Sequence, residues 1–162
     1  MKIIFAGNNE RSYKCLEFLK KKKLNITLVI CHNKKSREKY FKNLKFLATK
    51  LKIKNISPTN INNKNIKRKL SKIQPDLMIL CGYSQNILKK EIFEIPKHGT
   101  WNLHASDLPK YRGASPLNWA IINNEKKVGI SIIQVDKSLD GGDVIGKTYI
   151  KLTKNENIKT LI

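Results

Sequence analysis

Apolar residues in the first half of the chain form two kinds of pattern: short continuous runs, and runs that recur at every third or fourth position. The continuous runs, each of which predicts a strand buried on both faces, cover residues 3–6, 26–31 and 76–81, with a shorter run at 53–56. The spaced runs, each of which predicts a helix, surround Leu16, Phe18 and Leu19 and extend over residues 41–51 and 66–73. Strands and helices are therefore expected to alternate.

The second half continues this alternation and then changes character. A short helix is expected at 87–95, a strand at 99–104 and a helix that Pro116 opens, because proline suits a first helical turn. Residues 128–135 and 144–150 then have the pattern of two strands that flank a glycine-bearing loop. This order predicts an α/β fold with an open, mostly parallel, Rossmann-like sheet, helices on both faces and an antiparallel pair near the C-terminus. Ligands of such sheets bind at the carboxyl ends of the strands.

The length of the chain, 162 residues, suits one domain with a single buried core. No internal repeat, linker-like stretch or domain boundary is visible. Residues 160–162 have the pattern of a helix start. We therefore expect residues 1–162 to be one domain, truncated at its C-terminus and without a second domain.

Charge is the most unusual feature of the composition. The chain carries 33 Lys and Arg against 12 Asp and Glu, a formal net charge of +21. Residues 1–75 account for +18 of this charge. Such a basic half favours anionic partners, for example nucleic acid. Only four of the cations are arginines, however, and lysine in a chain crowded with Asn and Ile is typical of an AT-rich genome. A functional and a purely compositional origin of the charge both stay open.

The cysteines, Cys15, Cys31 and Cys81, are odd in number and lack C-x-x-C spacing. Neither a disulfide framework nor a zinc site is indicated, and no metal is expected. The N-terminal apolar run is shorter than a signal-peptide core, and no run approaches membrane-spanning length. We expect a cytoplasmic protein with no membrane partner; the sequence does not specify an oligomeric state.

Candidate chemistry is concentrated in residues 102–113 and in Asp140. Asn102 and His104 are two positions apart on a predicted strand, so their side chains point to the same face. A carboxylate such as Asp140 beside an imidazole orients the ring and favours its cationic form. An Asn amide and an imidazolium together stabilise an oxyanion on a polarised carbonyl, and no Ser or Cys nucleophile is required if the substrate supplies an amine. Taken singly, His104 fits a structural histidine equally well.

A dinucleotide site is not expected. Gly7-Asn-Asn-Glu10 follows the first strand, where a dinucleotide-binding fold carries G-x-G-x-x-G, and only one of the three glycines is present. The loop fits a plain turn, or a helix N-terminus that receives an anion.

Residues 102–116 resemble the motif of the folate-dependent formyltransferases, whose members act on methionyl-tRNA, glycinamide ribonucleotide or nucleotide-linked amino sugars. The family pattern N-x-H-x-S-x-L-P-x-[YW]-R-G-x-x-P is met by Asn102, His104, Ser106, Leu108, Pro109, Tyr111, Arg112, Gly113 and Pro116. The downstream pattern D-x-G-D is met by Asp140, Gly142 and Asp143. The resemblance extends from Ile3 to about Tyr149.

This resemblance implies that residues 1–162 are the N-terminal catalytic domain of a formyltransferase, with the formyltransferase fold. It implies Asn102, His104 and Asp140 as the catalytic residues and 10-formyltetrahydrofolate as the formyl donor. The implied folate contacts are Ser106, Asp107, Leu108 and Pro109, together with Cys81, Gly82 and Tyr83. Asp107 departs from the family pattern, which usually has an apolar residue at this position.

The acceptor stays open between two amines. Tyr111-Arg-Gly-Ala-Ser-Pro116 and the basic first half favour initiator methionyl-tRNA. The run at 116–123 favours a nucleotide-linked amino sugar, as does the lack of a P-D-R-P-like loop in Cys31-His-Asn-Lys-Lys-Ser-Arg-Glu-Lys39. The alternative from another class is a non-catalytic folate-binding or RNA-binding domain.

Overall fold

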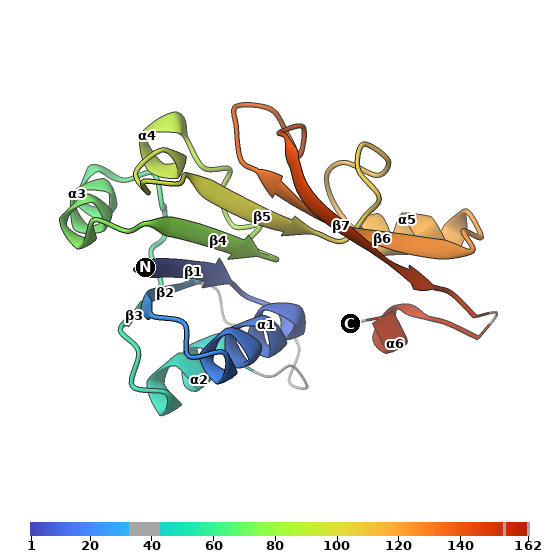
Figure 1. Cartoon of the computed structure of the whole chain (residues 1–162), viewed down its shortest axis with the longest axis horizontal. Coiled ribbons are helices and arrows are strands. Elements are labelled where there is room, and N and C mark those ends of the chain that lie inside the picture. Colours follow the sequence, from blue (N-terminus) through green and yellow to red (C-terminus); the bar gives the residue numbers. More distant parts are fainter. Residues whose placement is uncertain (33–42, 154, 162) are drawn as a thin grey trace. The chain divides into compact units, whose positions relative to one another are not determined.

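The computed structural model describes residues 1–32, 43–153 and 155–161. Its contacts divide the chain into two compact units, Met1–Trp101 and Asn102–Ile162. Figure 1 shows the helices and strands of each unit.

The first unit is built on four parallel strands, β1 (Ile3–Gly7), β2 (Ile26–Cys31), β3 (Asn55–Ile56) and β4 (Leu77–Cys81). Their order is β3-β2-β1-β4, so β1 lies between β2 and β4. All residues of β1 are buried, as its unbroken apolar run predicts for a strand covered on both faces. Gly7 pairs with Cys31 on one side and Cys81 on the other, so three strands end at the same edge.

Helices α1 (Glu10–Lys21), α2 (Leu44–Lys50) and α3 (Lys64–Ile73) connect these strands, and α4 (Lys90–Phe93) follows β4. The crossovers from β1 to β2 and from β2 to β3 run in one direction, whereas the return from β3 to β4 runs in the other. Because such crossovers are right-handed, α1 and α2 share one face and α3 covers the opposite face, as Figure 1 shows. The predicted α/β class and parallel strand arrangement are confirmed.

Asparagine begins each of the three connecting helices. The side-chain oxygens of Asn9, Asn43 and Asn63 each accept a hydrogen bond from a backbone N–H of the following turn, at 3.1, 3.1 and 2.8 Å respectively. Each cap satisfies an amide that the helix itself leaves unpaired, an interaction typically worth about 1 kcal/mol. Part of the high Asn content therefore serves local structure.

Strand β5 (Thr100–His104) begins in the first unit and ends in the second. The second unit also contains α5 (Pro116–Ile122), β6 (Lys127–Gln134), β7 (Val144–Lys151) and α6 (Ile158–Leu161). Strands β6 and β7 are antiparallel, which confirms the predicted pair. The core of this unit is a cluster of buried apolar residues: Ala105, Leu117, Ala120 and Val128.

Two helices expose apolar side chains that the spacing of the sequence would place inside. Phe18 in α1 is 57% exposed, and Trp119 and Ile122 in α5 are 53% and 64% exposed. The buried stripe of each helix is narrower than the pattern predicts. Helix α4 is also shorter than the expected 87–95, and its end before Pro96 agrees with the bias of the residue before a proline against the helical conformation. The predicted contribution of Phe41 to α2 lies outside the described residues.

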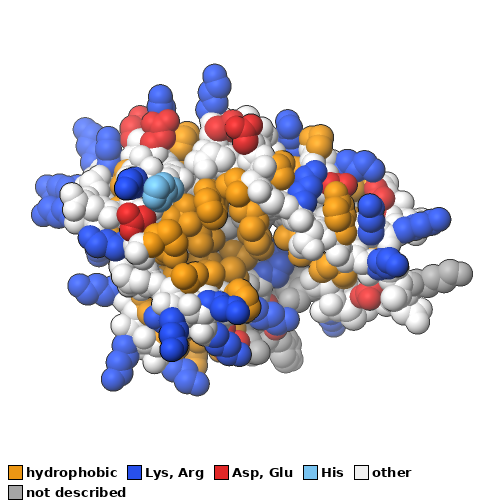
Figure 2. Space-filling view, viewed as in Figure 1, with side chains coloured by type: hydrophobic (Ala, Val, Ile, Leu, Met, Phe, Trp, Pro, Cys, Tyr) orange, Lys and Arg blue, Asp and Glu red, His pale blue; other side chains and the backbone are white. Residues whose placement is uncertain are grey.

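Basic side chains are spread over the first unit. On the face seen in Figure 2, Lys and Arg side chains surround the edge of this unit, while apolar side chains gather over its middle. The cations on this face therefore do not form one continuous patch. Within the described ranges, no helix combines the length and the apolar character needed to cross a bilayer.

Candidate active site

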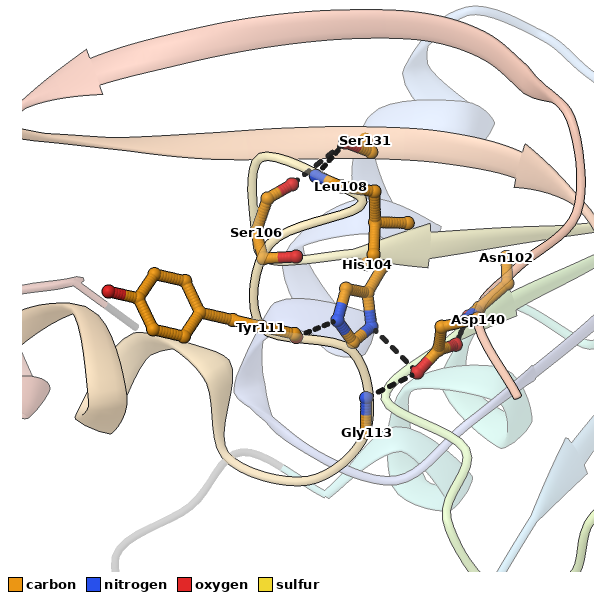
Figure 3. Close-up of polar contacts among 8 residues, drawn as sticks. All are labelled: Asn102, His104, Ser106, Leu108, Tyr111, Gly113, Ser131 and Asp140. Atoms are coloured by element: carbon orange, nitrogen blue, oxygen red, sulfur yellow. Dashed lines mark hydrogen bonds and ion pairs between the residues drawn. The ribbon is translucent and has the colours of Figure 1, made fainter.

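The three residues predicted to be catalytic lie together in the second unit (Figure 3). Asn102 and His104 extend from the same side of β5, and both reach Asp140 in the loop between β6 and β7. The Asn102 amide nitrogen donates to Asp140 Oδ1 at 3.1 Å. His104 Nδ1 lies 3.5 Å from Asp140 Oδ2. The structure therefore brings together side chains that are 38 residues apart in the sequence.

Asp140 is held in place from both sides of its carboxylate. Besides Asn102, the backbone N–H of Gly113 donates to Oδ2 at 2.9 Å. The backbone of Asp140 adopts a left-handed conformation with φ of 46°, which costs a non-glycine residue roughly 1–2 kcal/mol. Such strain is commonly found at functional sites, where the surrounding contacts maintain it. The side chain is only 13% exposed, so few water molecules compete for the carboxylate.

Both ring nitrogens of His104 face acceptors. Nε2 lies 2.9 Å from the backbone carbonyl of Tyr111, and a carbonyl oxygen can only accept. Nδ1 faces the Asp140 carboxylate. An imidazolium, which donates from both nitrogens, is the form that satisfies both neighbours at once. Sequence reasoning did not find the Tyr111 carbonyl, because a backbone group leaves no residue-type signal.

The loop that leaves β5, residues 105–113, is fixed against β6. The Ser131 hydroxyl donates to the Ser106 carbonyl at 2.7 Å and accepts from the Leu108 N–H at 3.3 Å. A side chain at Gly129 would lie 2.6 Å from the Asp107 Cα, so glycine is what allows the loop backbone to approach β6 this closely. Figure 3 shows this Ser131 bridge above the His104 site. The loop thus has few alternative positions.

Four of the residues predicted to contact folate lie on this loop. Ser106 and Leu108 are buried, Asp107 is half-buried and Pro109 is exposed. The Leu108–Pro109 peptide bond is cis. Among the described residues, the Ser106 hydroxyl is one of three buried side-chain polar atoms without a hydrogen-bond partner.

The other three predicted folate residues, Cys81, Gly82 and Tyr83, lie in the first unit at the end of β4. Gly82 has φ of 63°, and a Cβ there would lie 2.2 Å from the Asn9 side chain. Glycine is therefore required both by conformation and by space. The Tyr83 hydroxyl is a second buried atom without a partner in the described structure. Burial raises the pKa of Tyr83 to about 12, which keeps it protonated and able to donate.

His32 is a residue of this region whose role the sequence did not reveal. Its ring packs edge-on against Tyr83 with centroids 5.0 Å apart, and Nε2 lies 3.1 Å from the Ser84 N–H. Burial lowers the pKa of His32, so the neutral ring accepts this hydrogen bond. The sequence signal that could have pointed to His32 is its position one residue after β2, at the carboxyl end of a parallel strand. Of the basic segment that follows, residues 33–39 lie outside the described residues.

The three thiols are expected to differ in reactivity, which gives a test of the first unit. A hydrogen bond between the Cys15 and Cys81 side chains lowers the pKa of Cys15. The same hydrogen bond, together with burial, raises the pKa of Cys81. Burial raises the pKa of Cys31 to about 11. Since the thiolate is the reactive form, iodoacetamide should modify Cys15 first, as peptide mass mapping over time would measure. Equal rates at all three thiols would contradict these assignments.

In the part of the chain that the structure describes, no group of three His, Cys, Asp or Glu side chains is arranged to hold a metal ion.

Comparison with known proteins agrees with the family resemblance of the sequence, over the whole chain. Residues 1–162 match the family described as formyl transferase. The methionyl-tRNA formyltransferase of Prochlorococcus marinus subsp. pastoris is 40% identical, over 99% of this chain and 50% of its own length. The chain therefore spans about half the length of this curated relative.

Two solved structures share the fold. The phosphoribosylglycinamide formyltransferase of Bacillus halodurans aligns with a TM-score of 0.82 at 17% identity, over 99% of this chain and 85% of that one. WlaRD, a sugar 3N-formyl transferase solved in the presence of dTDP and 5-N-formyl-THF, aligns with a TM-score of 0.69 at 25% identity, over 94% and 52%. The match over residues 1–162, together with the Asn102, His104 and Asp140 arrangement, establishes that the chain belongs to the formyl transferase family.

Proposed function

We propose that this chain is the catalytic part of an enzyme that transfers a formyl group from 10-formyltetrahydrofolate to a primary amine. The observation that carries the proposal is the arrangement of Asn102, His104 and Asp140 at the end of β5. Initiator methionyl-tRNA is the first candidate acceptor. Three free cysteines suit a reducing compartment such as the cytoplasm.

In this mechanism the folate supplies an activated formyl group, and the amine of the acceptor attacks its carbon. A C–N bond to the acceptor forms, the bond to the folate nitrogen breaks, and the proton that the amine loses is returned to that nitrogen. The remaining N–H of the Asn102 amide and the His104 imidazolium stabilise the charge that develops on the formyl oxygen. Asp140 orients both donors and helps to relay the proton.

His104 must exchange one hydrogen bond to act in this way. In this structure its Nε2 faces the Tyr111 carbonyl and its Nδ1 faces Asp140. Catalytic hydrogen bonds often reach their final geometry only with substrate present. We propose that the Asp140 contact is kept and that substrate binding draws the Nε2 donor toward the formyl oxygen.

Two features of the described structure suit a folate ligand. Of the three buried side-chain polar atoms without a partner in the described structure, two belong to Ser106 and Tyr83, for which the family resemblance implies folate contact. Buried polar atoms are almost always hydrogen-bonded, so an unpaired one is commonly explained by a ligand or an ordered water. We propose that the Ser106 hydroxyl hydrogen-bonds to a polar group of the folate, and that the Tyr83 hydroxyl is available to a ligand in the same way.

The acceptor is proposed from similarity and charge. The methionyl-tRNA formyltransferase at 40% identity and the net charge of +21 support a tRNA acceptor, since phosphate contacts dominate nucleic-acid affinity. The similarity to a sugar 3N-formyl transferase supports a nucleotide-linked amino sugar as the second candidate. A non-catalytic folate-binding or RNA-binding domain is the third, but such a domain has no need of Asn102, His104 and Asp140 together.

The full-length protein tests this proposal with 10-formyltetrahydrofolate and separate acceptors. Charged initiator tRNA is offered in one reaction and a panel of nucleotide-linked amino sugars in another, and tetrahydrofolate release is followed. Release with tRNA alone supports the first candidate, and release with a sugar alone supports the second. No release with either acceptor, combined with tight and salt-dependent RNA binding, would favour the non-catalytic alternative.

A further inference from the structure

Asp107, where the family usually has an apolar residue, is held by two side chains of β7. Lys147 Nζ donates to Asp107 Oδ1 at 2.9 Å, and the Tyr149 hydroxyl donates to the same oxygen at 3.1 Å. Lys147 and Tyr149 are two positions apart on the strand, so both side chains project from the same face. The carboxylate of Asp107 therefore has two donors from one strand.

Lys147 makes a further contact with the same loop. Its ammonium group also donates to the backbone carbonyl of Leu108, the residue that follows Asp107. One side chain thus holds two consecutive residues of the loop. We refer to Asp107, Lys147, Tyr149 and the Leu108 carbonyl as the β7 clamp.

The charges around the clamp keep Asp107 ionised. The hydrogen bond from Lys147, followed by that from Tyr149, lowers the pKa of Asp107, and Lys127 on β6 adds to this effect. Lys127 also lies over the Tyr149 ring, 4.3 Å from its centroid. At neutral pH the clamp therefore combines a carboxylate with a charged donor, which makes its hydrogen bonds stronger than neutral ones.

The clamped loop also supplies the contacts that orient the proposed catalytic residues. Its first part, residues 106–108, is hydrogen-bonded to Ser131 on β6 and to Lys147 on β7. Its last part provides the Tyr111 carbonyl for His104 and the Gly113 N–H for Asp140. These two contacts do not involve Lys147, so the last part of the loop has anchors of its own.

We propose that Lys147 is a positioning residue for formyl transfer. It holds Asp107 and the Leu108 carbonyl, and so fixes the turn at Leu108 and Pro109 on which the formyl donor is proposed to lie. The inference rests on the proposed function for its reaction, while the clamp itself consists of contacts within the chain.

The test compares Lys147→Met with Lys151→Met in the full-length protein. Both substitutions remove one exposed lysine from β7, but the structure gives the Lys151 side chain no part in the clamp. In the ligand-free protein, amide hydrogen exchange of residues 105–113 should accelerate about tenfold in Lys147→Met and stay unchanged in Lys151→Met. Exposed ion pairs add little to global stability, so the thermal midpoints of both variants should stay close to that of the parent.

A second measurement separates positioning from a merely structural role. The KM for 10-formyltetrahydrofolate should rise about tenfold in Lys147→Met while kcat changes by less than about threefold, because the clamp acts on donor placement. The dissociation constant for 5-formyltetrahydrofolate, measured without an acceptor, should rise in parallel. Lys147→Arg, which keeps charged donors, should restore most of the affinity. Asp107→Asn should have little additional effect in the Lys147→Met background, because the two residues act through one contact.

Unchanged exchange at residues 105–113 in Lys147→Met overturns the clamp. Faster exchange with unchanged folate affinity and KM overturns the positioning role. If Lys147→Met does not fold, Tyr149→Phe should show smaller shifts in the same direction, because it removes only one donor to Asp107. A parent protein that binds no folate would contradict the proposed donor, whereas the exchange comparison would still decide the clamp.

Discussion

Replacing Asp140 with asparagine is expected to lower the rate of formyl transfer by a factor of about 100 or more, with a much smaller change in folate affinity. In the parent, both carboxylate oxygens are engaged: Oδ1 accepts from Asn102, Oδ2 accepts from Gly113, and His104 Nδ1 lies 3.5 Å from Oδ2. An amide has one oxygen and one NH₂ group, so one of these donors would face another donor. Either Asn102 or His104 then loses the orientation that the proposed chemistry needs.

Removing the imidazole in His104→Ala should have an effect of similar size, because one of the two proposed donors to the formyl oxygen is lost. The measurement is kcat and KM for each variant, with folate binding determined separately. Asp136→Asn is the matched control, since Asp136 is an exposed carboxylate of the same loop that bonds only to Ser138 in the described structure. Near-normal turnover in either Asp140→Asn or His104→Ala would refute their assignment as catalytic residues.

The second large effect is expected at Gly142, which follows Asp140 in the loop between β6 and β7. A Cβ at this position would lie 1.8 Å from the backbone oxygen of Gln134 and 3.0 Å from its carbonyl carbon. Because the obstacle is backbone rather than a flexible side chain, β6 or the loop must move. Gly142→Ala should therefore reduce the free energy of unfolding by about 1–3 kcal/mol or more, and transfer should fall as Asp140 is displaced.

Gly146 provides the control for this prediction. It lies on β7 close by, and an added Cβ would meet no atom within 4 Å. Gly146→Ala should be neutral or should stabilise the protein by up to about 1 kcal/mol, since alanine loses less chain entropy than glycine in a strand. Urea unfolding of both variants measures the difference. Equal midpoints would show that the loop accommodates a side chain at 142, contrary to the geometry.

The order and type of the main elements could be predicted because periodicity reports burial directly. The unbroken apolar runs of β1, β2 and β4 became buried strands, and Pro116 lies in the first turn of α5 as expected. The division into the units Met1–Trp101 and Asn102–Ile162 has no such signal, since it depends on contacts rather than on local pattern. Helix faces were less predictable: Phe18 and Trp119 fit the apolar spacing but are exposed.

The proximity of Asn102, His104 and Asp140 was predictable for a different reason. Side-chain alternation on one strand placed the first two on the same face, and the family resemblance supplied the third. Their supporting contacts were not predictable in this way. The Tyr111 carbonyl is a backbone group, and Lys147 is one of 29 lysines whose pairing with Asp107 depends on how β7 lies against the loop. His32 became visible only through its contacts with Tyr83 and Ser84.

Passage of a formyl carbon from the folate to an amine is tested most directly by following that carbon. The full-length protein would be given 10-formyltetrahydrofolate labelled in the formyl group, with charged initiator tRNA or an amino-sugar nucleotide as acceptor. We expect one labelled formyl group on the acceptor amine for each tetrahydrofolate released, and formation of both products at a rate lower by a factor of about 100 or more in His104→Ala. Label recovered as free formate would mean that water is the acceptor, and no release of tetrahydrofolate with any acceptor would contradict the account.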